Sequence, residues 1–198
     1  MRQLSLFILI LLFSACGGKR EKKVQQQQLN EQETERHFLE KGKEIASATQ
    51  AELLKIVQDA LAKGGPEYAI DFCKLEALNL KDSLSALTNS KIQRLSLKYR
   101  NPADKPQLQT ELDQLMAYQA LFDEGKQLSP GIHVFDDRVV YYQPIMIASG
   151  ACLLCHGDPE TQIAKETMQV INRNYADDHA TGYALNDFRG MWKITFQN

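Results

Sequence analysis

The sequence predicts an α+β fold with antiparallel strand pairing, on three observations. Apolar residues recur at helical spacing through much of residues 33–125. Two runs rich in β-branched and aromatic residues, joined by a tight Asp136-Asp137 turn, predict a hairpin over 132–147. A last run with alternating apolar residues predicts a closing strand over 190–196. Helices that precede strands in this way favour an α+β arrangement over a parallel sheet.

Length and composition indicate one soluble globular domain with appendages. The chain has 198 residues, of which 43% are hydrophobic and 24% charged. Its formal net charge of -2 argues against a nucleic-acid partner, which would select a basic surface.

The first fifteen residues have the pattern of a signal peptide. Arg2 precedes an apolar run over 4–13, which is too short to span a bilayer. The segment ending at Cys16 resembles a bacterial lipobox, so we expect Cys16 to become the lipidated first residue of the mature chain. This predicts a lipid-anchored protein of the bacterial cell envelope, on the periplasmic side. The alternative is an ordinary secretory leader in which Cys16 is incidental.

A flexible tether is expected over 16–32, because this stretch is polar, charged and rich in glutamine. The folded domain is then expected over 33–198. Its first helix covers about 33–63 and ends at Gly64-Gly65, and a second helix runs from Pro66 to about residue 87.

The second helix places Cys73 on an apolar face together with Ala69, Leu80 and Leu84. An extended segment is expected over 93–105. A third helix follows, beginning at Pro106 and ending at Gly125.

The pentapeptide Cys152-Leu153-Leu154-Cys155-His156 is the attachment signature of a c-type haem. Two thiols at this spacing can form thioethers with one porphyrin, and the adjacent His156 can serve as the proximal iron ligand. The sequence therefore predicts one covalent haem c per chain. The alternatives are a redox disulfide, half of a zinc site or a structural disulfide; no βαβ context or second ligand pair accompanies the motif.

After the haem motif, a short helix is expected. Asp158 would be its N-cap, and it would continue to about residue 172. Residues 174–186 are expected to form a loop before the closing strand.

Three separated motifs resemble one family, the Tll0287-like haem domain, formerly a domain of unknown function (DUF3365). They are Leu95–Pro102 (LSLKYRNP), Cys152–Gly157 (CLLCHG) and Ala180–Gly190, with ATGY at its start and DFRG at its end. The resemblance covers about residues 33–196. It implies a PAS-like fold, in which helices flank a small antiparallel sheet, and a covalently bound c-type haem.

The distal iron ligand stays open between several side chains. The resemblance implies Cys73, and an unpaired cysteine on an apolar helix face agrees with it. His179 is a rival, because it stands where the family commonly has Lys. The other candidates are His133 and the methionines Met146, Met168 and Met191. The alternative for each histidine is a surface imidazole, and the alternative for each methionine is core packing. Arg100 and Arg189 are candidates to pair with haem propionates, or else form ordinary salt bridges.

These residues predict a membrane-tethered mono-haem cytochrome that transfers electrons to a redox partner protein. The alternative is a redox or gas sensor in which a small gas ligand displaces Cys73 from the iron. A haem enzyme such as a peroxidase is a third reading, but a six-coordinate iron with His156 and Cys73 would disfavour it. We therefore expect a carrier or sensor and not an enzyme.

Overall fold

The computed structural model describes residues 17–197, and for residues 17–20 and 73–81 it describes the backbone alone. The chain divides into two units, Met1–Arg36 and His37–Asn198, and each is described by itself. Within residues 17–197, no helix has the length and hydrophobicity that a membrane-spanning segment requires.

The part of the first unit that the structure describes is helical. It belongs to α1 (Gly17–Thr88), so the expectation of a flexible tether over 16–32 is not matched for residues 17–32. Glutamine, glutamate and lysine are good helix formers, and side-chain bonds one turn apart support the helix. Gln26 donates to Asn30 and Gln27 donates to Glu31, each at 3.0 Å. All side chains over 21–32 are exposed, which agrees with a stretch that contributes no core.

α1 is interrupted where the sequence predicts the end of its first helix. Gly64 and Gly65 have non-helical backbone angles, and Gly65 has a φ of 73°, which favours glycine. Pro66 then stands in the first turn of the continuing helix. We call residues 37–63 the first arm and residues 66–88 the second arm; the two predicted helices are confirmed.

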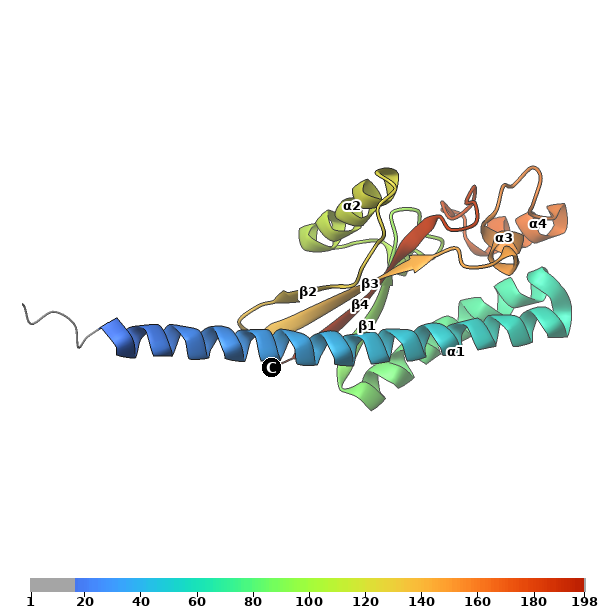
Figure 1. The fold of residues 1–198 in the computed structure, drawn as a ribbon. Helices are drawn as coiled ribbons and strands as arrows, with labels where there is room; N and C mark the ends of the chain where they lie inside the picture. The colour runs from blue at the N-terminus through green and yellow to red at the C-terminus, as the bar shows by residue number, and fades with distance from the viewer. Residues whose placement is uncertain (1–16, 198) are drawn as a thin grey trace, which may run out of the picture. The chain divides into compact units, whose positions relative to one another are not determined.

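Four strands form one open sheet in the order β1-β4-β3-β2, with every neighbouring pair antiparallel (Figure 1). The strands are β1 (Ser90–Leu95), β2 (Gly131–Val134), β3 (Arg138–Met146) and β4 (Phe188–Gln197). The predicted hairpin and closing strand are confirmed. The extended segment expected over 93–105 begins earlier and ends at Leu95, and Pro102–Asp104 forms the short helix η1. Pro144 lies in β3 beyond the end of its pairing with β2, where its missing N–H is tolerated.

The first arm of α1 covers one face of the sheet. Ile45 and Ala46 pack with Tyr141, Trp192 and Ile194 in a buried cluster. The helix approaches so closely at Gly42 that an added Cβ would lie 2.3 Å from the Cγ atom of Tyr141. A side chain at this position would therefore separate the arm from the sheet.

The opposite face is covered by α2 (Gln109–Asp123), as Figure 1 shows. Leu115 and Tyr118 pack against Val140, Tyr142 and Met191, because alternate strand residues point to opposite faces. This is the third predicted helix, although it begins at Gln109 rather than at Pro106.

Two short helices, α3 (Gly150–His156) and α4 (Lys165–Asn174), lie between β3 and β4. The prediction that a helix starts at Asp158 is wrong. The Asp158 side chain accepts bonds from the N–H groups of Glu160 and Thr161, which forms a turn, and α4 begins only at Lys165. Ile70 of the second arm joins Ile163, Val170 and Ile171 in a buried cluster at α4. The layers confirm an α+β fold with helices flanking an antiparallel sheet.

Candidate functional site

The haem-attachment motif forms most of α3. Cys152 and Cys155 lie three residues apart on this helix, so their side chains share a face, and His156 follows directly. Neither Cys152 nor Cys155 is in a disulfide. All three side chains line one cavity. The sequence predicts the motif, but not that it would be helical.

The walls of this cavity come from distant parts of the chain. The first arm of α1 contributes an apolar wall, and Ala69 and Ile70 of the second arm face the same space. Met146 and Ile147 follow from the end of β3. The three family-like motifs, which are separated along the chain, all line this cavity. The first contributes Leu95, Arg100 and Asn101, the second is the haem motif, and the third contributes Arg189 and Gly190.

Gly190 allows β4 to pass close to β1 at this cavity. Its φ is 153°, and an added Cβ would lie 2.4 Å from the carbonyl oxygen of Leu95. Glycine is therefore required by both the backbone angle and the available space.

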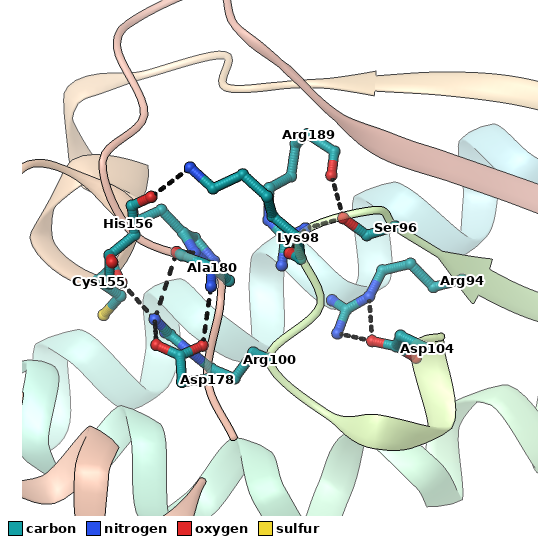
Figure 2. Close-up of polar contacts among 11 residues, drawn as sticks. Arg94, Ser96, Lys98, Arg100, Asp104, Cys155, His156, Asp178, Ala180 and Arg189 are labelled. Carbon is teal, nitrogen blue, oxygen red and sulfur yellow. Dashed lines mark hydrogen bonds and ion pairs between the residues drawn. The ribbon is translucent and has the colours of Figure 1, made fainter. Parts of the chain in front are cut away.

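The ring of His156 is held in one orientation. Its Nδ1 atom lies 2.7 Å from the carbonyl oxygen of Ala180, and only a protonated Nδ1 can donate to a carbonyl (Figure 2). The Nε2 atom of this tautomer then carries the lone pair that can bind a metal. Burial, followed by the charges of Arg189 and Arg100, holds the pKa of His156 well below its ordinary value of 6.5. The imidazole is therefore neutral at pH 7, the form in which histidine binds metals.

Arg100 reaches the haem motif from the segment after β1. Its guanidinium forms a two-point ion pair with Asp178, with Nε and Nη2 each 3.1 Å from a carboxylate oxygen. The Nη2 atom also donates to the carbonyl oxygen of Cys155 at 2.7 Å. Figure 2 shows this guanidinium between Asp178 and the haem motif. Arg100, expected at a propionate, thus has three close acceptors within the protein.

Arg189 occupies a different environment on the cavity wall. Its Nη1 atom donates to the Oγ atom of Ser96 at 2.6 Å and to the carbonyl oxygen of Lys98 at 3.0 Å. Its guanidinium carbon also lies 5.4 Å from the centre of the Tyr183 ring. These partners are neutral, and burial lowers the pKa of Arg189 to about 10. The guanidinium remains charged at pH 7, so an anion in the cavity would be favoured.

Arg94 also lines the cavity, and it is ion-paired. Its Nη2 atom lies 2.5 Å from the Asp104 carboxylate, and this ion pair joins β1 to η1. This arginine was not a sequence candidate. A salt bridge over ten residues, from a strand to the next turn, has no distinctive sequence pattern.

The rival iron ligands lie in different places. Met146 borders the cavity, whereas Met191 is buried beneath α2 and Met168 packs at the α4 cluster. His179 is exposed and bonds the carboxylate of Asp177 at 3.0 Å. His133 is exposed on β2, where its ring contacts those of Phe135 and Tyr142.

Two candidate positions lie outside the described side chains. The backbone of Cys73 is part of α1, one turn after Ala69 and Ile70, but its side chain is outside the described part of the structure. Cys16 lies outside the described residues altogether.

Sequence reasoning missed Asp178 and Ala180, which contact the residues of this site. Asp178 pairs with Arg100, and the carbonyl of Ala180 accepts from His156. Both residues lie in a stretch that was predicted only as a loop. The ATGY motif pointed to this stretch, but a backbone acceptor has no side-chain signature. Together, two thiols, a neutral imidazole with an available Nε2 atom and an apolar wall fit a c-type haem.

Comparisons with known proteins agree with this architecture. The model of the Tll0287-like family (Tll0287) matches residues 21–197. No curated protein matches the chain. Among solved structures, the crystal structure of the cyanobacterial heme-protein Tll0287 is similar in fold, with a TM-score of 0.57 and 21% sequence identity. The similarity covers 77% of this chain and 92% of that chain. Because the family model matches nearly the whole sequence, the protein belongs to the Tll0287-like family.

Proposed function

We propose that this protein binds one haem c covalently through Cys152 and Cys155, with His156 as an axial ligand of the iron. One observation carries the proposal: the three side chains line a single cavity, and the Nδ1 bond to Ala180 leaves the Nε2 atom of His156 for the metal. The heme named for the similar solved structure supports the same cofactor.

Mass spectrometry of protein made in a host that attaches c-type haem tests this proposal. The intact chain should carry one haem that survives denaturation. Cys152→Ala and Cys155→Ala should each keep one thioether at lower yield, and the double variant should carry no covalent haem. A wild-type chain with no covalent haem would overturn the proposal.

We further propose electron transfer as the role, with no catalytic turnover. When bound, the haem would supply a one-electron ferric–ferrous couple. The protein would hold His156 neutral and oriented on one side of it. On the other side we propose Cys73, whose position one turn after Ala69 and Ile70 in the second arm supports this choice. A cysteine thiolate would favour ferric iron and so predicts a low midpoint potential.

A spectrum of electron paramagnetic resonance on the ferric protein tests the Cys73 ligand. Thiolate coordination should give a low-spin signal that is lost in Cys73→Ala. Met146→Leu is the matched control, because Met146 is a thioether that borders the same cavity. If Met146→Leu changes the signal and Cys73→Ala does not, the ligand assignment is wrong.

A sensor is the second candidate, supported by the interruption of α1. The first and second arms both line the cavity, and non-helical Gly64 and Gly65 join them. This junction would let the second arm move when Cys73 is displaced by a small gas ligand.

We propose that a lipid on Cys16 anchors the protein at the periplasmic side of the cell envelope, where it meets its redox partner. Labelling cells with a radioactive or alkyne-bearing fatty acid tests this anchor. The wild-type protein should be labelled and sediment with membranes, while Cys16→Ser should be unlabelled. An unlabelled wild-type chain would contradict the anchor but would not affect the haem proposal.

A further inference from the structure

The acceptor that orients His156 is a carbonyl in an irregular segment. Residues 178–181 belong to no helix or strand, so regular backbone bonding does not hold the Ala180 carbonyl at its position. To accept from one imidazole nitrogen in a fixed direction, this carbonyl therefore needs hydrogen bonds or ion pairs from other parts of the chain. The surrounding contacts show where these supports come from.

Asp178 shapes the segment from within. Its Oδ1 atom accepts the N–H of Ala180 at 3.0 Å, so the carboxylate holds Ala180, the residue whose carbonyl is the His156 acceptor, by its N–H group. The same carboxylate receives Nε and Nη2 of Arg100. The Asp178 and Arg100 side chains are only 6% and 10% exposed, so water competes weakly for these bonds.

Arg100 joins this segment to the haem helix. Its Nη2 atom donates to the carbonyl of Cys155, the residue before His156. The same atom lies 3.5 Å from the carbonyl oxygen of Ala180. One guanidinium thus connects the residue before His156 with the Ala180 carbonyl that accepts from His156, as Figure 2 shows.

Two backbone bonds after Ala180 complete the connection between this segment and α3. His156 and Gly157 accept bonds from Tyr183 and Gly182, at 2.9 and 2.8 Å. These bonds align the segment with the end of α3. The Arg100–Asp178 pair contacts Ala180 itself, with Asp178 at its N–H and Arg100 near its carbonyl oxygen.

We propose that Arg100 and Asp178 are positioning residues for His156, which hold the Ala180 carbonyl at its Nδ1 atom and thereby strengthen its Nε2 atom as an iron ligand. The inference deepens the proposed function and rests on it. It assigns Arg100 a role on the His156 side of the haem and leaves Arg189, with its neutral partners, as the arginine for a propionate.

The exchange rate of the His156 Nδ1 proton, measured by NMR on the ferrous haem-loaded protein, tests the proposal. Arg100→Lys keeps the charge but loses the two-point contact, and Asp178→Asn keeps the shape but loses the carboxylate. Each should increase the exchange rate by about tenfold or more, because the bond to Ala180 opens more often. Either variant alone is sufficient if the other does not fold.

The midpoint potential gives a second readout. A hydrogen bond to Nδ1 makes the imidazole a stronger donor and so favours ferric iron. Weakening it should therefore raise the potential in both variants. Glu111→Gln is the matched control. It also breaks a buried ion pair, the one with Lys193, but this pair lies at α2, away from the haem motif.

Three outcomes would overturn the positioning role: unchanged proton exchange in both variants, unchanged potentials, or equal changes in Glu111→Gln. The last would mean that general destabilisation is the cause. A wild-type chain without covalent haem would instead refute the proposed function, and this result is obtained before any variant is compared.

Discussion

His156 shows how much of the site depends on a single backbone carbonyl. The sequence predicts this residue as an iron ligand from its place in the motif. The tautomer depends on Ala180, which accepts from Nδ1 at 2.7 Å. The neutral state follows mainly from burial, which lowers the pKa of His156. Both properties arise from contacts with residues far along the chain.

Arg189→Gln should reduce the stabilisation that haem attachment provides. In the wild type, the buried guanidinium has neutral protein partners, so a propionate would be its anionic partner. The difference in unfolding free energy between loaded and haem-free protein should fall by about 1–3 kcal/mol, as for loss of a charged hydrogen bond. Denaturant unfolding of both forms measures it.

The control for this prediction is Arg94→Gln. Arg94 lines the same cavity but is paired with Asp104 at 2.5 Å. Its loss should destabilise the loaded and haem-free forms alike. If Arg189→Gln also affects both forms equally, Arg189 is a structural residue and does not bind the cofactor.

Sequence reasoning treated Arg100 and Arg189 alike, because both are arginines within family motifs. The structure separates them. Arg100 is paired with Asp178, a residue that no local pattern connects to it, while Arg189 contacts a hydroxyl, a carbonyl and a ring. Ion pairs between distant segments become visible only when the fold brings them together.

At the scale of elements, local signals predicted boundaries well where glycine or a tight turn fixes the backbone. Gly64-Gly65 and the Asp136-Asp137 turn are of this kind. The errors fall where competing local structures have similar free energies. Asp158 can cap a helix or close a turn, and the polar stretch over 17–32 can be a coil or an exposed helix.

The buried pair between Glu111 and Lys193 attaches α2 to β4. The Oε1 atom of Glu111 lies 2.6 Å from Nζ of Lys193, and its other oxygen caps the N–H groups of Gln107 and Leu108. Burial opposes ionisation of Glu111, but the bonds from Lys193 and these two amides outweigh it. The pKa of Glu111 is therefore lower than its ordinary value of 4.5.

Glu111→Gln should destabilise the protein by about 3 kcal/mol at pH 7, because Lys193 would remain buried without its counterion. The lowered pKa means that the wild-type contribution is fully present above pH 4.5 and is lost as the pH falls through the folded-state value. The gap between wild type and variant should therefore narrow below about pH 4. Urea unfolding at pH 7, 5 and 3 measures this. A gap independent of pH would show that Glu111 is not ionised in the folded protein.

At the scale of the whole molecule, the cavity is a junction of three layers. The first arm of α1, the ends of β1, β3 and β4, and the α3 helix each contribute one side of it. The sequence predicts the helical arm and the strands, since each has its own periodicity, but it predicts the haem motif without its helix. It does not predict their convergence, which depends on packing of the second arm against α4 and of the first arm against the sheet.

The two candidate roles, electron carrier and gas sensor, differ in what the proposed second iron ligand, Cys73, does at this cavity. In an electron carrier, Cys73 stays on the iron in both redox states, so the ferrous protein has no open position. In a sensor, Cys73 is bound weakly to ferrous iron and must dissociate before a gas can enter. Carbon monoxide, which binds ferrous haem only at an open position, distinguishes them.

We expect the wild-type ferrous protein to leave carbon monoxide unbound in stopped-flow mixing, and Cys73→Ala to bind it rapidly, because the variant removes the proposed ligand. Met146→Leu should behave like the wild type, since Met146 borders the cavity without occupying the iron in this scheme. Slow binding to the wild type, at a rate independent of gas concentration, would mean that a ligand must first dissociate, and would favour the sensor. Rapid binding to Met146→Leu alone would instead identify Met146 as the ligand and remove the basis for both roles of Cys73.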